Sequence, residues 1–106
     1  MLSIVIPARQ EEKVIGDTVN RLKSALSLPH EIIVSDDGST DRTVEIARTN
    51  ADQVVTFSGE KHTRGRTRNA GAKVAHGEFI AFIDADVVVP EPNAFYRRAL
   101  KHFEDP

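Results

Sequence analysis

The stretch EIIVSDDGSTDRT, residues 31–43, gives the strongest indication of the fold. Its first five residues form a short, mostly apolar run that predicts a buried strand. The polar cluster that follows, residues 36–41, is rich in side chains that cap helix N-termini. Val44, Ala47 and Ala51 then recur on one side of a helix. We therefore predict a strand that leads through a short polar loop directly into a helix.

The same succession of strand and helix runs along the whole chain. The predicted strands are residues 2–6, 31–35, 53–57 and 78–83. The other helices are indicated by an apolar stripe in the first, at Ile15, Val19, Leu22 and Leu26, and by small residues in the third, at Ala70, Gly71, Ala72, Val74 and Ala75. A polar, basic loop is expected at residues 58–66. A closing amphipathic segment is expected from Phe95, Ala99 and Phe103.

This alternation favours an α/β fold, a Rossmann-like parallel sheet flanked by helices on both faces. Because crossover connections are right-handed, few topologies remain, and we predict the strand order 3-2-1-4. The switch point of that sheet lies between its first and fourth strands. Ligands of such sheets bind at the carboxyl ends of the strands, beside the switch point.

The composition indicates one globular domain, residues 1–106, and argues against several kinds of function. The net charge of −2 provides no basic surface, so we expect no nucleic-acid partner. The chain has no cysteine, which excludes disulfides and thiolate metal sites, and its four histidines lack a metal-binding spacing. No apolar run reaches membrane-spanning length and no signal peptide is recognisable, so a cytoplasmic protein is expected.

Three polar clusters follow the first, second and fourth predicted strands, and the topology brings them to one crevice. They are residues 7–9, 36–37 and 84–86. Asp84 and Asp86 are two residues apart, so in an extended segment their carboxylates point to one side. Two such charges repel unless a cation intervenes, and Mg²⁺ or Mn²⁺ with a substrate diphosphate fits. The alternative is a solvated turn whose acids face water or cap the next helix.

Asp36 and Asp37 raise the same choice at the end of the second strand. A carboxylate there can accept a hydrogen bond from a nucleobase N–H or from a ribose hydroxyl. Helix capping is the alternative, and Asp41 is already available for capping. Because the fold needs no further acids at this place, we favour a binding role for the pair.

Three arginines, Arg64, Arg66 and Arg68, alternate in the loop expected before the third helix. Arginine near a helix N-terminus favours phosphate binding, and a solvated basic loop is the alternative. Glu11 lies just before the first helix, where its charge most simply favours the helix N-terminus.

The segments SIVIPARQEE, EIIVSDDGSTDRT and GRTRNAGAKVAHGEFIAFIDAD occur in this order. Together they resemble the N-terminal half of the family 2 glycosyltransferases, which have the GT-A fold. The resemblance covers residues 2–90. It implies a domain that binds a nucleotide-diphosphate sugar, either a UDP-sugar or a GDP-sugar, together with Mg²⁺ or Mn²⁺.

The resemblance also implies a role for individual residues at the sheet end. These are Pro7, Ala8 and Glu11 in the nucleotide pocket, Asp36 at the base with Asp37 beside it, Arg68 near the diphosphate, Asp84 towards the ribose and diphosphate, and Asp86 as the metal ligand.

Members of the family are about twice as long, which implies that the acceptor site and the catalytic base lie beyond Pro106. We therefore expect a donor-binding fragment that transfers no sugar by itself. The acceptor of the full-length protein would be a glycan, a lipid or a small molecule, and that protein could associate peripherally with the inner face of the membrane.

Three alternatives remain beside this hypothesis. A non-catalytic nucleotide-binding module would share every feature described above. A phosphoacceptor receiver domain would carry its paired acids after the first strand, where this chain has residues 7–9. A nucleotidyltransferase usually has a glycine-rich phosphate loop there, and the segment ARQEE contains no glycine.

Overall fold

The computed structural model describes residues 1–58, 64–87, 91, 93–94 and 96–98 of the chain. Its sheet has four strands, β1 (Leu2–Ala8), β2 (His30–Asp37), β3 (Gln53–Phe57) and β4 (Phe79–Phe82). All neighbouring pairs are parallel and the order is β3-β2-β1-β4, which confirms the predicted topology.

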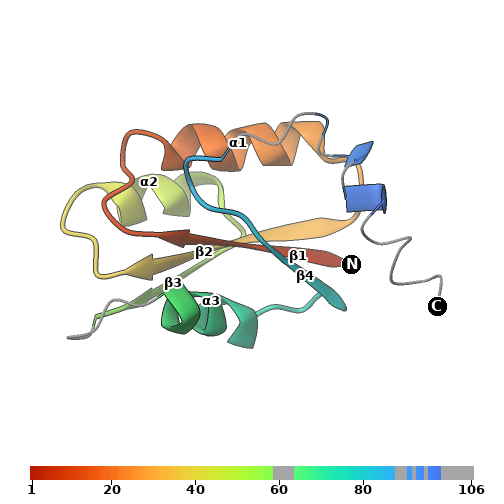
Figure 1. Cartoon of the computed structure of the whole chain (residues 1–106). Helices are drawn as coiled ribbons and strands as arrows, with labels where there is room; N and C mark the ends of the chain where they lie inside the picture. Colours follow the sequence, from red (N-terminus) through yellow and green to blue (C-terminus); the bar gives the residue numbers. More distant parts are fainter. Residues whose placement is uncertain (59–63, 88–90, 92, 95, 99–106) are drawn as a thin grey trace.

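Three helices cover the two faces of this sheet (Figure 1): α1 (Ile15–Ala25) and α2 (Thr43–Asn50) on one face and α3 (Arg64–Lys73) on the other. The core lies between the sheet and α1. Its fully buried members include Ile4, Ile6, Ile32 and Val34 from the strands and Ile15 and Val19 from α1. None of the helices in the described part of the chain is both long and apolar enough to cross a membrane.

Both central strands are longer than predicted, and this moves two of the polar clusters into the sheet. β1 includes Pro7 and Ala8, which stand opposite Ser35 and Asp36 in the parallel register. Asp37 is also a strand residue and stands opposite Phe57 of β3. Asp36 and Asp37 are therefore consecutive residues of one strand, and their side chains point to opposite faces of the sheet.

The prediction that Arg64, Arg66 and Arg68 lie in a loop is wrong, because α3 begins at Arg64. Arginine is a good helix former, but this part of α3 carries no apolar stripe to announce it. α3 lies close to the sheet at Gly71, where an added Cβ atom would stand 2.4 Å from Val5 Cγ1. The close approach explains why small residues occupy this part of the helix.

The fourth strand ends earlier than predicted, at Phe82. Asp84 and Asp86 lie in a turn, closed by a hydrogen bond from the Val87 N–H to the Asp84 carbonyl (3.1 Å). The alternation of an extended strand therefore does not apply to these two acids, and the expectation that it sets them side by side is wrong.

β4 is an edge strand in the described sheet, as the predicted strand order requires. Because α3 packs over β1 and β2, it leaves Ile80 and Phe82 41% and 43% exposed. Residues 12–14 form a turn, and α1 starts at Ile15, the first residue of the predicted apolar stripe. The closing segment with Phe95, Ala99 and Phe103 falls on residues outside the described part of the chain.

Candidate functional site

The carboxyl ends of β1 and β2 lead into two loops that are hydrogen-bonded to each other. The Gln10 N–H donates to Ser39 Oγ (2.9 Å), and the Glu11 N–H donates to Thr43 Oγ1 (2.8 Å). In the opposite direction, the Thr40 N–H donates to Gln10 Oε1 (2.5 Å). The two loops therefore form a single wall at this end of the sheet, beside the predicted switch point.

Asp36 lies at the base of this wall and is 1% exposed. Its two carboxylate oxygens accept hydrogen bonds from the Ser39 N–H (2.9 Å) and from the Ser39 hydroxyl (2.5 Å). A carboxylate oxygen has more than one lone pair, so these contacts leave acceptor capacity for a ligand. Asp36 thus shapes its own loop in addition to any contact with a ligand.

Asp41 lies one residue before the N-cap residue of α2, Arg42, and contacts the first residue of the helix. Its carboxylate accepts hydrogen bonds from the Thr43 hydroxyl and, at 3.0 Å, from the Thr43 N–H at the start of α2. The hydroxyl contact is the main cause that lowers the pKa of Asp41. The contact to the first N–H of α2 thus comes from Asp41, whereas the carboxylate of Asp36 is bonded to Ser39.

Asp37 faces the layer of α3, on the opposite side of the sheet from Asp36. It shares this face with Ser35, whose hydroxyl donates to the Thr67 carbonyl of α3 (2.7 Å). Asp37 is 4% exposed, so it lies between the sheet and the start of α3. The adjacent acids therefore belong to two different faces rather than to one shared pair.

The pKa of Glu11 is sensitive to the negative charges around the site. The pKa of Glu11 is raised by burial and, in decreasing order, by the negative charges of Asp86, Asp41 and Asp84. These carboxylates are therefore near enough to Glu11 to repel it, which is the situation that a bound cation relieves.

No group of three or more side chains that could bind a metal is present among the residues that the structure describes. Magnesium, however, is usually held by one or two carboxylates together with waters and substrate phosphates. Asp86 is exposed and Asp84 half-buried, so the carboxylate of Asp86 is accessible to such an ion. The acidic charge near Glu11 and the open position of Asp86 together fit a metal that arrives with a diphosphate.

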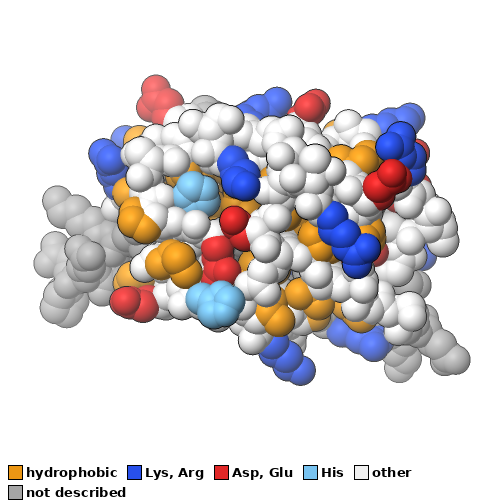
Figure 2. Space-filling model, turned by 180° about the vertical axis from the view of Figure 1, so that it is seen from behind, with side chains coloured by type: hydrophobic (Ala, Val, Ile, Leu, Met, Phe, Trp, Pro, Cys, Tyr) orange, Lys and Arg blue, Asp and Glu red, His pale blue; other side chains and the backbone are white. Residues whose placement is uncertain are grey.

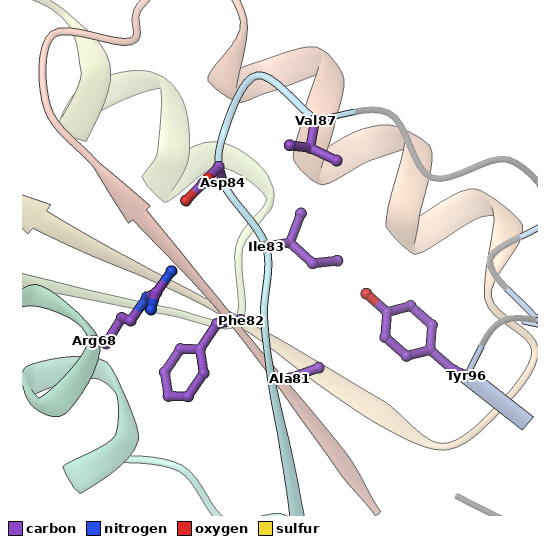
Figure 3. Close-up of a pocket in the computed structure, with 7 residues that line it drawn as sticks. All are labelled: Arg68, Ala81, Phe82, Ile83, Asp84, Val87 and Tyr96. Atoms are coloured by element: carbon purple, nitrogen blue, oxygen red, sulfur yellow. The ribbon is translucent and has the colours of Figure 1, made fainter. Parts of the chain in front are cut away.

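A hollow of about 230 Å³ lies along β4 next to Asp84 (Figure 3). It is lined by Arg68, Ala81, Phe82, Ile83, Asp84, Val87 and Tyr96. The Arg68 guanidinium lies over the Phe82 ring, 5.5 Å from its centroid, on the same side of the chain as Asp84. Arg68 Nε is buried and makes no hydrogen bond to the described residues. Because the Arg68 side chain lines the hollow, the hollow carries a positive charge suited to an anionic ligand.

The eight predicted site residues therefore all lie at the carboxyl end of the sheet. The two central strands end in Pro7 and Ala8 and in Asp36 and Asp37. The negative charges of Asp84 and Asp86 raise the pKa of Glu11. Arg68 and Asp84 line the same hollow. Two further residues, Gln10 and Ser39, hold the loops together and were not predicted. The polar types in the two loops were visible in the sequence, but the pairing between loops was not.

Comparison with known proteins places this geometry in a family. The family described as "Glycosyl transferase family 2" matches residues 3–106. The 4,4'-diaponeurosporenoate glycosyltransferase of Staphylococcus aureus is 39% identical over 90 residues, which are 81% of this chain but 24% of that enzyme. The chain thus spans about a quarter of the length of this relative.

Two solved structures show the same architecture. The glucosyl-3-phosphoglycerate synthase of Mycobacterium tuberculosis, in complex with Mn²⁺, uridine diphosphate and glucosyl-3-phosphoglycerate, matches with a TM-score of 0.73 and 28% identity, over 87% of this chain and 36% of that one. Residues 1–349 of S. aureus TarS, in complex with uridine diphosphate, match with a TM-score of 0.74 and 29% identity, over 97% of this chain and 32% of that one.

Proposed function

Because the chain belongs to glycosyl transferase family 2, we propose that it binds the sugar donor, a nucleoside-diphosphate sugar, at the carboxyl end of its sheet. The observation that carries the proposal is the convergence of Asp36, Asp84, Asp86 and Arg68 on that end, beside the switch point of a parallel sheet. Sugar transfer is proposed for a longer enzyme in which this chain forms the donor-binding half.

The nucleoside part of the donor fits the wall made by the two loops. Pro7 and Ala8 end β1 and would form the floor beside the base, with Glu11 at its margin. Asp36 has acceptor capacity beyond its contacts to Ser39 and would accept an N–H of uracil or guanine. Asp37, on the other face, would stand towards the phosphate side.

The diphosphate part fits the opposite side of the site. Arg68 presents a buried Nε–H without a partner among the described residues, and a guanidinium suits phosphate oxygens. Asp86 would hold Mg²⁺ or Mn²⁺, and Asp84 would lie towards the ribose and diphosphate. When bound, the metal would neutralise the charge that develops on the departing diphosphate.

Both solved relatives were captured with uridine diphosphate, and one of them with Mn²⁺. These complexes make a uridine-diphosphate sugar the first donor to test and Mn²⁺ the first metal. The acceptor and the catalytic base are proposed to belong to the remainder of the longer enzyme, because the chain matches only 24% of the length of its glycosyltransferase relative.

Calorimetric titration of the chain with UDP-glucose and GDP-mannose, each with Mn²⁺ and with chelator, tests the proposal. We expect one of the two to bind with a clear metal dependence. The Asp86→Asn variant should lose that dependence, whereas Glu78→Gln, an exposed acid before β4 at the other end of the sheet, should retain it. Absence of metal-dependent binding to either donor would falsify the proposal.

The family match gives no support to a receiver domain or a nucleotidyltransferase. A nucleotide-binding module without activity would show the same binding, and a transfer assay on the longer protein separates it from an enzyme. The chain described here is expected to show no transfer by itself.

A further inference from the structure

Gln10, in the loop after β1, has a backbone conformation that its type rarely adopts. Its φ is 54°, in the left-handed region where a side chain crowds the backbone. Such a conformation persists only where the surrounding contacts hold it, and it occurs disproportionately at binding sites. The conformation of Gln10 therefore suggests that the contacts that hold it serve a binding site.

Those contacts all come from the loop after β2. The side-chain oxygen of Gln10 accepts hydrogen bonds from the Thr40 N–H (2.5 Å), from the Thr40 hydroxyl (3.2 Å) and, more weakly, from the Asp41 N–H (3.4 Å). Its own backbone N–H donates to Ser39 Oγ (2.9 Å). Gln10 thus bonds to three consecutive residues of the neighbouring loop through both its main chain and its side chain.

Ser39 passes this attachment on to Asp36. A hydroxyl has one proton, and the Ser39 hydroxyl accepts from Gln10 and donates to Asp36 Oδ1 (2.5 Å), so its direction is fixed. The Ser39 N–H holds the other carboxylate oxygen at 2.9 Å. Because Asp36 is also 1% exposed, its carboxylate has one orientation in the folded chain.

We propose that Gln10 and Ser39 are positioning residues for the nucleoside part of the donor. They join the loops after β1 and β2 into one preformed wall and fix the Asp36 carboxylate within it, so that the base meets a rigid surface. This inference rests on the proposed function, because it assumes that the nucleoside lies against this wall. It assigns no contact to the diphosphate or to the metal.

Three variants separate the side-chain contacts from the backbone conformation. Ser39→Ala removes the hydroxyl that links Gln10 to Asp36, and Ser39→Thr restores a hydroxyl. Gln10→Asn keeps a residue type that tolerates positive φ, but its shorter side chain draws the acceptor oxygen away from Thr40. Lys13→Ala is the matched control, because Lys13 is an exposed residue of the same loop.

The measurement is calorimetry of each variant with uridine diphosphate and, separately, with pyrophosphate, both in the presence of Mn²⁺. We expect Ser39→Ala and Gln10→Asn to bind uridine diphosphate about tenfold more weakly, the scale of one lost charge-assisted hydrogen bond, with pyrophosphate binding unchanged. Ser39→Thr and Lys13→Ala should bind both ligands as the unsubstituted chain does.

If Gln10 and Ser39 only stabilise the fold, the affinities for uridine diphosphate and for pyrophosphate should fall together. If the two residues have no role, both affinities should stay unchanged. Either result in both Ser39→Ala and Gln10→Asn overturns the inference. If one variant does not fold, the other decides the question. If the unsubstituted chain binds neither uridine diphosphate nor guanosine diphosphate, the proposed function itself is refuted, and the inference with it, so the two failures are distinguishable.

Discussion

Gly71 of α3 and Val5 of β1 lie in direct contact, because a Cβ atom on Gly71 would stand 2.4 Å from Val5 Cγ1. The same atom would also stand 3.3 Å from Ser35 Cβ of β2. α3 can therefore pack on the two central strands only with glycine at this position, and α3 in turn carries Arg68 to the candidate site.

Gly71→Ala should destabilise the chain, because the new methyl group forces α3 away from the sheet. We expect a loss of about 1–3 kcal/mol in the free energy of unfolding, the usual cost of overpacking. Gly65→Ala in the same helix is the control, since nothing lies within 4 Å of its added Cβ. That change should be neutral or stabilising, and urea unfolding compares the two; equal losses in both would contradict the packing argument.

Glu31, at the amino end of β2, should make stability depend on acid pH. Burial by itself raises the pKa of Glu31, but hydrogen bonds from Ser3, His76 and Gln53 outweigh it and lower the pKa to about 2. Histidine and acidic side chains lie close together on the face opposite to that of Figure 1 (Figure 2). This network lies at the other end of the sheet from the candidate site.

Because the folded pKa of Glu31 is below its ordinary value of 4.5, the ionised carboxylate stabilises the fold fully above that value. The contribution is lost as the pH falls from about 4.5 towards 2. Glu31→Gln should cost about 2 kcal/mol at neutral pH and flatten the fall in unfolding free energy over that interval. Parallel slopes for the two proteins below pH 4.5 would contradict this assignment.

Asn93 should stabilise the C-terminal end of α1. Its side-chain oxygen accepts a hydrogen bond from the Ser27 N–H (2.7 Å), and its amide donates to the Ala25 carbonyl. Asn93→Asp keeps the acceptor but loses the donor, and it adds a negative charge at the negative end of the helix. We expect the free energy of unfolding to fall by about 1 kcal/mol, measured by thermal unfolding. An unchanged midpoint temperature would show that the amide contact adds no stability.

A change at Arg68 should weaken binding of the diphosphate part of the donor but not of its nucleoside part. Arg68→Lys keeps the charge but loses the planar group over Phe82 and the buried Nε donor. Binding of pyrophosphate with Mn²⁺ should weaken about tenfold, while binding of uridine should stay the same. Arg48→Lys on the exposed side of α2 is the matched control; equal effects of both changes on pyrophosphate would exclude a specific role for Arg68.

Strand order was predictable because each strand of this sheet is a short apolar run between polar segments, and alternation with helices restricts the connections. The family resemblance is confirmed by the match to glycosyl transferase family 2 over residues 3–106. The start of α3 was not predictable, because Arg64, Arg66 and Arg68 form helical turns without an apolar stripe. Their helical position depends on packing further along, at Gly71.

The site was predictable in its residue types and only partly in its geometry. Sequence placed Asp36 and Asp37 together, whereas the length of β2 directs them to opposite faces. Sequence placed Asp84 and Asp86 on an extended segment, whereas the strand ends at Phe82 and the chain turns between Asp84 and Val87. The positive φ of Gln10 depends on contacts with residues about 30 positions away, so no local pattern indicates it.

The most direct test of the account is the location of Mn²⁺ bound together with uridine diphosphate, measured by paramagnetic broadening of backbone amide NMR signals. Broadening falls steeply with distance, and Glu31 and Asp36 are separated along β2 by about 17 Å. We predict that small amounts of Mn²⁺ selectively broaden the signals of Glu11, Asp84 and Asp86 and leave that of Glu31 sharp. Broadening centred on Glu31, or no broadening selective for the carboxyl end of the sheet, would contradict the assignment of this end as the donor site.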